Sequence, residues 1–239
     1  MAADDARLRT ALVLAGGGSF GAIQVGMLHS LATHGIAADM VVGSSVGSLN
    51  GAYYAGNPTL EGIERLEAIW RALRRSDVFP VNWAAMLGFL LRRNFLVEPH
   101  GLRMLIERNL TYRNLEDAKI PIHIVATNIL TGGTVVLSEG SAAQAIIASA
   151  AIPAVFPPVK FEDSYLVDGA VSSNTAVKVA VDQGAPLTGS PYDFSQTGAL
   201  IDRAIKSTDA WIADGGFEKP NVHAQLSIHK HDNQKSVSG

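Results

Sequence analysis

The sequence predicts an α/β protein built on a mostly parallel sheet with helices on its faces, and three observations lead to this prediction. Short apolar runs alternate with segments of helical spacing from residue 10 onward, as in parallel sheets whose strands are joined by helices. Hydrophobic residues make up 47% of the chain and charged residues 17%, which is a globular composition. The length of 239 residues suits one core, so we expect residues 1–239 to form a single domain.

Two strand–helix units open the chain. Residues 10–15 form a short apolar run that is ended by glycine, which predicts a buried strand. Residues 20–34 have helical spacing, and Gly35 provides the stop signal. Residues 39–43 predict a second strand, and residues 46–55 predict a second helix that is rich in small residues.

The later elements follow less regularly. A third helix is expected to begin at Asn57-Pro58, with Asn57 as the N-cap and Pro58 as the first helical residue, and a fourth helix is expected after Pro99. Further elements are predicted as strands at 120–128, 134–137 and 165–167 and as helices at 141–151, 175–183 and 200–212. Residues 184–194 contain two prolines and two glycines where another strand is expected, and residues 215–239 predict a loose polar tail.

Composition and charge exclude several classes of function. The net charge of −3 argues against a nucleic-acid partner, because such a surface is normally basic. The absence of cysteine excludes disulfides, thiolate metal sites and a cysteine nucleophile, and no spacing of acidic residues and histidines suggests a metal. Asp4 and Asp5 stand where a secretory signal would be positively charged, and no apolar run is long enough to span a membrane. We therefore expect a cytoplasmic protein with no metal and no cofactor.

The most informative motif is Gly43-Ser44-Ser45-Val46-Gly47, which follows an apolar run and reads as Gly-x-Ser-x-Gly on a strand-to-helix turn. A serine at this position sits on a sharp turn with its hydroxyl exposed. The flanking Gly43 and Gly47 have no Cβ, so the turn can close and a substrate carbonyl can approach the backbone. The motif predicts Ser45 as a nucleophile.

Two further motifs supply the other parts that ester cleavage by serine requires. Asp168-Gly169 ends a short strand, and a carboxylate whose pKa is raised by burial can accept the serine proton. The glycine loop at 16–21 follows a strand and precedes a helix, so its backbone N–H groups suit a developing negative charge. Each motif has a simpler interpretation as a helix cap, a turn or a close packing point, but a single active site explains all three together.

Two alternative functions are consistent with parts of this pattern. Residues 16–21 also satisfy the dinucleotide-binding fingerprint, but the end of the second strand that should recognise a ribose holds the Ser45 turn, and Asp39 stands at the other end. A Ser-Asp-His triad has the correct chain order if it uses a histidine of the polar tail, namely His223, His229 or His231. A catalytically silent lipid- or partner-binding module on the same scaffold is a third possibility.

An apolar cluster at residues 81–95 has two interpretations. It contains Trp83 and Phe89 and is followed by Arg92 and Arg93, which suit the C-terminal end of a core helix. It can instead be a cap over Ser45 that receives acyl chains or contacts a membrane surface peripherally.

Together these motifs resemble the patatin-like phospholipases, and the resemblance covers most of residues 10–185. It rests on the glycine loop, on the Ser45 turn and on three further segments, which are ATNILTGG from Ala126, ASAAIPAVFPPV from Ala148 and LVDGAVSSNTAV from Leu166. The resemblance implies a three-layer α/β/α sandwich and a lipid acyl hydrolase, of phospholipase A or esterase type, that uses a Ser-Asp dyad without histidine.

By this resemblance Ser45 is the nucleophile, Asp168 is the base, and the amides of Gly16, Gly17 and Gly18 form the oxyanion hole. The residues that support the motifs are Gly21, Gly43, Gly47, Gly169 and Ala170. The family usually carries Arg or Lys before the last glycine of the loop, where this chain has Phe20. That departure removes a positive charge for a phosphate head group, so lipids and simple esters are both expected as substrates.

Overall fold

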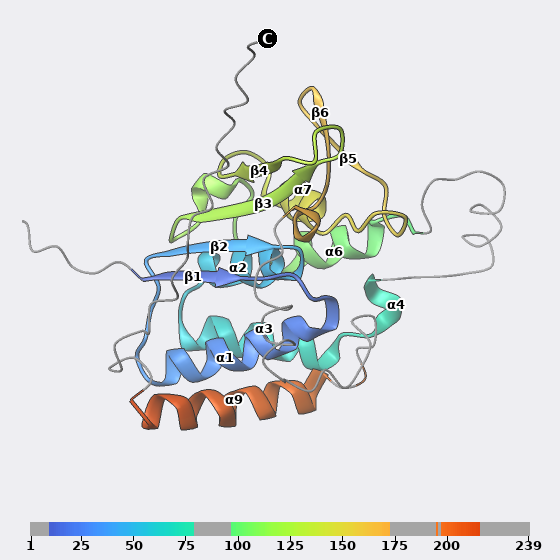
Figure 1. Cartoon of the computed structure of the whole chain (residues 1–239). Helices are drawn as coiled ribbons and strands as arrows, with labels where there is room; N and C mark the ends of the chain where they lie inside the picture. The colour runs from blue at the N-terminus through green and yellow to red at the C-terminus, as the bar shows by residue number, and fades with distance from the viewer. Residues whose placement is uncertain (1–9, 79–96, 173–194, 196, 216–239) are drawn as a thin grey trace, which may run out of the picture.

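A six-stranded mixed sheet forms the centre of the fold (Figure 1). The computed structural model describes residues 10–78, 97–172, 195 and 197–215. The strands are β1 (Ala11–Leu14), β2 (Met40–Ser44), β3 (Ile122–Asn128), β4 (Thr134–Leu137), β5 (Val159–Phe161) and β6 (Ser164–Asp168). They follow the order β1-β2-β3-β6-β5, and β4 pairs with the opposite edge of β3.

Most of the strands run in one direction. β1, β2 and β3 are mutually parallel, β4 and β6 are antiparallel to β3, and β5 is antiparallel to β6, so four of the six strands share a direction. The predicted α/β class with a mostly parallel sheet flanked by helices is confirmed. β5 was not predicted, because a three-residue strand with a lysine at its centre has no recognisable period.

The described helices are also close to those predicted. They are α1 (Gly21–Thr33), α2 (Val46–Gly56), α3 (Leu60–Ala72), α4 (Arg75–Val78), α6 (His100–Asn109), α7 (Ala142–Ser149) and α9 (Thr197–Ala213), with short 3₁₀ turns η1 (Gly18–Phe20), η2 (Leu115–Asp117) and η3 (Gly169–Val171). The helix predicted at 175–183, the junction at 184–194 and nearly all of the tail at 215–239 lie outside the described residues.

The predicted start of the third helix is wrong by two residues. The N-cap of α3 is Thr59, whose hydroxyl accepts a hydrogen bond from the amide of Gly62 at 3.1 Å. Asn57 is instead the C-cap of α2, where its amide bonds to the carbonyl oxygens of Tyr53 and Tyr54, and its side-chain oxygen accepts from the Thr59 hydroxyl and not from an amide of α3.

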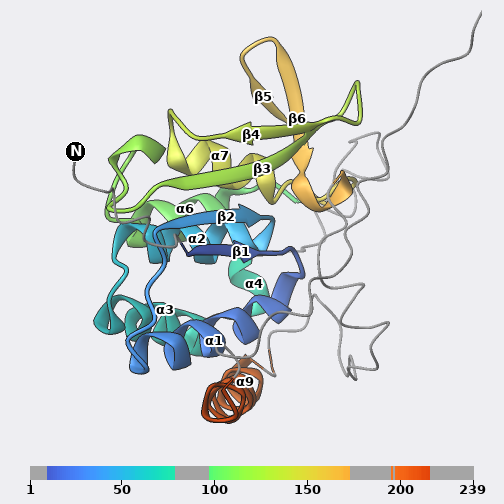
Figure 2. The same cartoon turned by 60° about the vertical axis from the view of Figure 1, so that its left-hand side comes forward.

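The described helices stack in layers on one face of the sheet (Figures 1 and 2). α2 contacts all three parallel strands and α7 contacts β3, β5 and β6, while α1 and α3 pack beyond α2 and α9 covers α1. α2 can approach the strands closely because its packed positions are glycines. A Cβ on Gly47 would lie 2.1 Å from the carbonyl oxygen of Leu14, and one on Gly51 would lie 2.8 Å from a methyl carbon of Val41.

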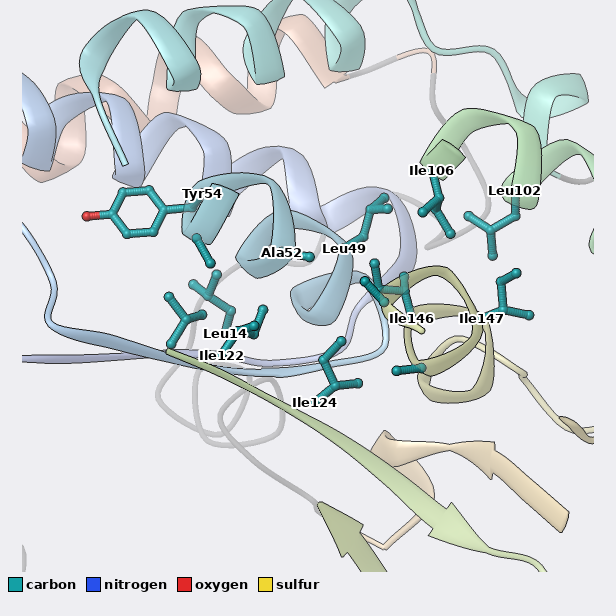
Figure 3. Close-up of a cluster of buried hydrophobic side chains, with 14 of the residues drawn as sticks. Leu14, Leu49, Ala52, Tyr54, Leu102, Ile106, Ile122, Ile124, Ile146 and Ile147 are labelled. Atoms are coloured by element: carbon teal, nitrogen blue, oxygen red, sulfur yellow. The ribbon is translucent and has the colours of Figure 1, made fainter. Parts of the chain in front are cut away.

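The hydrophobic core lies between the sheet and these helices (Figure 3). Its side chains come from the inner face of the strands and from α2, α6 and α7, and they include Leu14, Leu49, Ala52, Leu102, Ile106, Ile122, Ile124, Ile146 and Ile147. Because one continuous core joins the first and second halves of the described chain, the segments that carry Ser45 and Asp168 are fixed to the same body.

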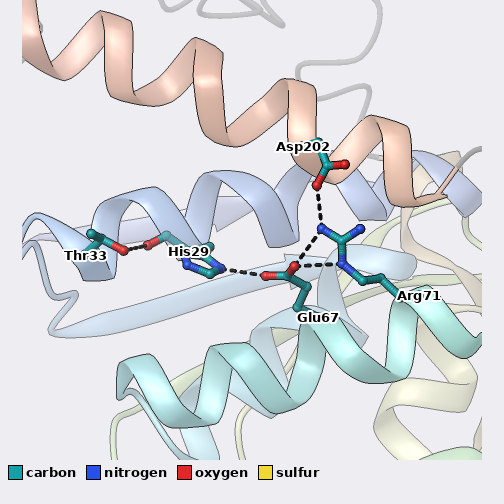
Figure 4. Close-up of polar contacts among 5 residues, drawn as sticks. All are labelled: His29, Thr33, Glu67, Arg71 and Asp202. Atoms are coloured by element: carbon teal, nitrogen blue, oxygen red, sulfur yellow. Dashed lines mark hydrogen bonds and ion pairs between the residues drawn. The ribbon is translucent and has the colours of Figure 1, made fainter.

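α9 is attached to α1 and α3 by close packing and by a surface ion-pair network (Figure 4). Glu67 accepts hydrogen bonds from Arg71 at 2.7 Å and pairs with His29 at 2.6 Å, and Arg71 also donates to Asp202 of α9 at 2.5 Å. These bonds, first that to Asp202 and then that to Glu67, raise the pKa of Arg71. Solvent-exposed ion pairs of this kind contribute only about 0–1 kcal/mol each.

The packing contact is tighter than the ion pairs. A Cβ on Gly26 of α1 would lie 2.5 Å from the carbonyl oxygen of Ile201 and 2.7 Å from the Cβ of Ala204, both in α9. Main-chain atoms of a helix cannot move aside separately, so a side chain at this position has to displace α9 as a whole.

We therefore expect Gly26→Leu to lower the free energy of unfolding by about 1–3 kcal/mol through overpacking. The matched variant Arg71→Gln, which removes the ion pair between α3 and Asp202 of α9, should cost less than about 1 kcal/mol. Urea denaturation of both variants measures the difference. A larger loss in Arg71→Gln than in Gly26→Leu would show that charge, and not packing, holds α9.

Candidate active site

Ser45 lies on a strained turn between β2 and α2. Its backbone φ of 54° and ψ of −126° fall in a region that residues with a side chain rarely adopt. The turn can close because Gly43 has no side chain. A Cβ on Gly43 would lie 2.5 Å from the carbonyl oxygen of Gly47, so only glycine fits there. Such strain persists only where the surroundings fix it, and it is concentrated at functional sites.

β3 brings Ser45 and Asp168 together. Val125 of β3 pairs with Ser44, and the next residue, Ala126, pairs with Asp168 on the same edge of the strand. The end of β2 and the end of β6 therefore meet, although Ser45 and Asp168 are 123 residues apart in sequence. The Ser45 hydroxyl donates a hydrogen bond to Oδ2 of Asp168 at 2.6 Å, and both side chains are buried.

Ser149 of α7 supports the turn from behind, and sequence reasoning missed it. Its hydroxyl accepts a hydrogen bond from the amide of Ser45 at 2.9 Å and donates one to the carbonyl oxygen of Val125 at 2.6 Å. The side chain is fully buried, at 0% exposure. Its only signal in the sequence is a polar residue near the end of a helix of small apolar residues.

Burial and hydrogen bonding shift the pKa of the Asp168 carboxyl in opposite directions. Desolvation raises the pKa of its carboxyl, because the charged form loses its water shell. Hydrogen bonds from the Ser45 hydroxyl and from the amide of Ala170, at 2.8 Å, lower the pKa and offset part of this rise. The net pKa is raised, so the carboxylate is a stronger base than an exposed aspartate.

The predicted glycine loop lies directly against this pair. A Cβ on Gly16 would stand 3.1 Å from the Cβ of Ser45 and 3.0 Å from that of Ala170, so the loop approaches as closely as a chain without a side chain allows. Gly17 and Gly18 have φ of 155° and 57°. Within the described part of the chain, the amide of neither Gly17 nor Gly18 donates to a main-chain acceptor.

Two further glycines of the predicted motifs, Gly169 and Gly21, stand where a side chain would not fit. A Cβ on Gly169 would lie 2.1 Å from the carbonyl oxygen of Val125, and one on Gly21 would lie 2.5 Å from a methyl carbon of Val46. These glycines allow β3, η3, α1 and α2 to converge on one point. All ten residues predicted for the site thus lie around Ser45 or support the segments that carry it.

An apolar cavity opens beside the Ser45 side chain. It has a volume of about 60 Å³ and is lined by Ser45, Gly18 and apolar side chains of α2, α3, α6, α7 and the segment that follows α7, among them Leu49, Trp70, Leu102, Ile146 and Phe156. A cavity with this lining favours a hydrocarbon chain next to the hydroxyl.

The structure also bears on the two alternative sites, a dinucleotide-binding loop and a Ser-Asp-His triad. Asp39, which a dinucleotide site needs at the ribose, instead accepts a hydrogen bond from the amide of Thr10 at 2.7 Å, at the opposite end of β1 from the glycine loop. His223, His229, His231 and the cluster at 81–95 lie outside the described residues. The histidines that are described pair elsewhere in three cases, His29 with Glu67, His34 with Ser30 and His123 with Ser138.

The described residues contain no group of three or more acidic residues and histidines that could hold a metal ion. Among the helices in the described ranges, none is both long enough and apolar enough to cross a membrane.

Comparison with known proteins identifies relatives that are much longer than this chain. Lysophospholipase NTE1 of Lodderomyces elongisporus is 28% identical over 204 residues, which are 78% of this chain and 13% of that protein. Lysophospholipase NTE1 of Mycosarcoma maydis is 30% identical over 174 residues, which are 73% of this chain and 9% of that protein. Patatin-like phospholipase domain-containing protein 7 of Rattus norvegicus is 28% identical over 177 residues, which are 73% of this chain and 13% of that protein. The chain thus spans about one eighth of the length of the first of these curated relatives.

Two solved structures have similar chains. VipD of Legionella pneumophila aligns with a TM-score of 0.48 and 17% identity over 69% of this chain and 46% of that one. ExoU in the ExoU–SpcU complex of Pseudomonas aeruginosa aligns with a TM-score of 0.48 and 16% identity over 86% of this chain and 51% of that one. The model of the family described as patatin-like phospholipase matches residues 12–181, more than two thirds of the sequence, and the chain therefore belongs to the patatin-like phospholipase family.

Proposed function

We propose that this chain is a serine lipid acyl hydrolase, of phospholipase A or esterase type, in which Ser45 is the nucleophile and Asp168 the base. The observation that carries the proposal is the 2.6 Å hydrogen bond between the two buried side chains. Membership of the patatin-like phospholipase family supports it, as do relatives named lysophospholipase. Those names describe proteins of which the match covers only 13%, so the activity of this chain is a proposal in its own right.

The geometry supports a reaction in two steps. As the Ser45 oxygen attacks the ester carbonyl carbon, its proton passes to Oδ2 of Asp168, which is already the hydrogen-bond acceptor. The carbonyl oxygen becomes negative, and the amides of Gly16, Gly17 and Gly18 are its proposed donors. The carbon–oxygen bond to the alcohol then breaks, and Asp168 returns the proton to the departing oxygen.

Water completes the cycle. Asp168, ionised again, removes a proton from a water molecule that attacks the acyl-enzyme carbonyl. The bond to the Ser45 oxygen breaks, the serine regains a proton, and a fatty acid leaves. The raised pKa of Asp168 matters in both steps because it brings the carboxylate closer in basicity to the groups that it must deprotonate.

The substrate is proposed to be a lipid or another ester with an apolar acyl chain. The cavity beside Ser45 has an apolar lining, which suits the acyl part. Phe20 at the end of the glycine loop supplies no positive charge, so this position does not select for a phosphate head group.

The first test is replacement of the nucleophile. We expect wild-type protein to hydrolyse chromogenic acyl esters, and Ser45→Ala to lower kcat at least about 10³-fold because no other group can form the acyl-enzyme. A fluorophosphonate probe should label the wild type and not Ser45→Ala. Undiminished hydrolysis by Ser45→Ala would contradict the assignment, and a wild type that neither turns over esters nor reacts with the probe would favour the non-catalytic binding module.

The second test separates activity from stability at Asp168. Asp168→Asn should lower kcat by about 10²- to 10⁴-fold, because an amide cannot accept the serine proton. The pKa of Asp168 is raised in the folded state, so the folded protein holds that proton more tightly than the unfolded chain. Wild-type stability therefore falls as pH rises from the ordinary aspartate value of 3.8 through the raised value.

The side chain of Asn does not titrate. The difference between the free energies of unfolding of Asp168→Asn and wild type should therefore shift in favour of the variant between about pH 4 and about pH 8. Thermal denaturation at both values measures the change. A variant that loses stability relative to wild type as pH rises would show that the carboxylate is stabilised, and not desolvated, at this site.

Peripheral membrane contact through residues 81–95 also remains a proposal. We expect a Trp83→Ala/Phe89→Ala double variant to co-sediment with liposomes less than wild type does, because interfacial binding scales with the apolar area that is buried. A double variant of two exposed apolar residues elsewhere, Leu130→Ala/Trp211→Ala, is the matched control. Equal binding by all three proteins, each shown to be folded, would eliminate this contact.

A further inference from the structure

Behind the glycine loop lies a buried amide network that the proposed reaction does not use. Asn50 of α2 is 0% exposed. Its Nδ2 donates hydrogen bonds to the carbonyl oxygen of Gly21 at 2.9 Å and to Oε1 of Gln24 at 2.9 Å, while its Oδ1 accepts one from Nε1 of Trp70 at 2.8 Å. A buried amide with each of its groups paired holds its partners in one arrangement.

Gln24 extends this network to the other end of the loop. Its Nε2 donates to the carbonyl oxygen of Ala15 at 2.6 Å. Ala15 directly precedes Gly16, and Gly21 directly follows Phe20. The two amide side chains therefore hold the main chain on both sides of residues 16–20.

The loop needs an external attachment of this kind. Gly17 has the most permissive backbone of any residue type and sits at a φ of 155°. Inside the loop, the amide of Phe20 bonds to the carbonyl oxygen of Gly17 at 3.1 Å, and the amide of Gly21 bonds to the carbonyl oxygens of Gly18 and Ser19. These bonds stay within the turn, so they do not fix its position relative to α2. Donors for an oxyanion are effective only when they are fixed in place before the charge develops.

Trp70 links the same network to the cavity. Its ring lines the space beside Ser45, and a Cβ on Gly21 would lie 2.8 Å from a ring carbon. The indole nitrogen of that ring is bonded to Asn50, so the wall of the proposed acyl cavity and the glycine loop share one attachment.

We propose that Gln24 and Asn50 are positioning residues that fix the glycine loop in the geometry needed to stabilise the oxyanion. This inference rests on the proposed function, because it gives a purpose to the amides of residues 16–18. Neither residue contacts the reacting atoms. They act through the carbonyl groups of Ala15 and Gly21, which they hold from behind.

Gln24 is the better position for a test because it is only half-buried, whereas a change at Asn50 threatens folding. Gln24→Met has a similar shape and loses both hydrogen bonds. Gln24→Glu keeps an oxygen that can accept from Asn50 but loses the donor to Ala15. Gln144→Met is the matched control, since Gln144 likewise donates its Nε2 to a main-chain oxygen, that of Lys160, at 2.9 Å.

Two readouts are measured on each variant, with the thermal midpoint as a check of folding. The first is kcat and KM on a short-chain 4-nitrophenyl ester. Both Gln24 variants should lose about 10- to 100-fold in kcat, because a displacement of order 1 Å at a catalytic group has effects of this size. KM should stay within about twofold, since the cavity that binds the acyl part is retained. Gln144→Met should match the wild type.

The second readout needs no activity. Hydrogen exchange of the Phe20 and Gly21 amides, which bond within the loop turn, should be faster in both Gln24 variants and unchanged in Gln144→Met. Unchanged exchange in the Gln24 variants would overturn the positioning role. Faster exchange with wild-type kcat would overturn its link to catalysis, as would wild-type kcat in Gln24→Glu. A wild type without esterase activity would instead refute the proposed function, and the exchange result would still decide whether the loop is held by Gln24.

Discussion

The pairing of β3 with two different strands along one edge is the constraint on which the candidate site depends. Val125 holds the end of β2 and Ala126 holds the end of β6, so the register of one strand sets the distance between the Ser45 hydroxyl and the Asp168 carboxylate. A slip of one residue in either ladder would move one of these groups to the other face of the sheet. The same strand supplies the carbonyl oxygen of Val125, which anchors Ser149 and thereby the turn at Ser45.

Close approach of main chains is the second requirement, and glycine meets it. Gly16, Gly47 and Gly169 each face a neighbour at a distance where a Cβ would collide with it or be tightly compressed. The strands, the loop and the helices can therefore converge until water is largely excluded from Asp168, which is 4% exposed. Exclusion of water strengthens every electrostatic interaction at the site, which is what a developing oxyanion requires.

Much of this arrangement was predictable because its signals are local. Strand and helix periods and the Gly-x-Ser-x-Gly and Asp-Gly motifs lie within short windows, and the resemblance joined Ser45 and Asp168 into one site. The start of α3 was misplaced because Asn57 is the C-cap of α2 and Thr59 is the N-cap of α3, and the sequence does not show which of two nearby capping residues a helix uses. Ser149, Gln24 and Asn50 were missed for a related reason. Each is a polar residue whose partner is distant in sequence, and neither periodicity nor spacing identifies such a partner.

α2 has a consequence for how the protein folds. Nine of its eleven residues are buried, so it has no solvent-facing side, and it has no charged residue to form the ion pairs that stabilise an isolated helix. It gains stability only when β1, β2 and α1 surround it. The contact between Ser45 and Asp168 also closes a chain segment of 123 residues, a non-local contact that forms late. Recovery of the proposed esterase activity during refolding would therefore report completion of the whole fold and not the earlier return of helical content.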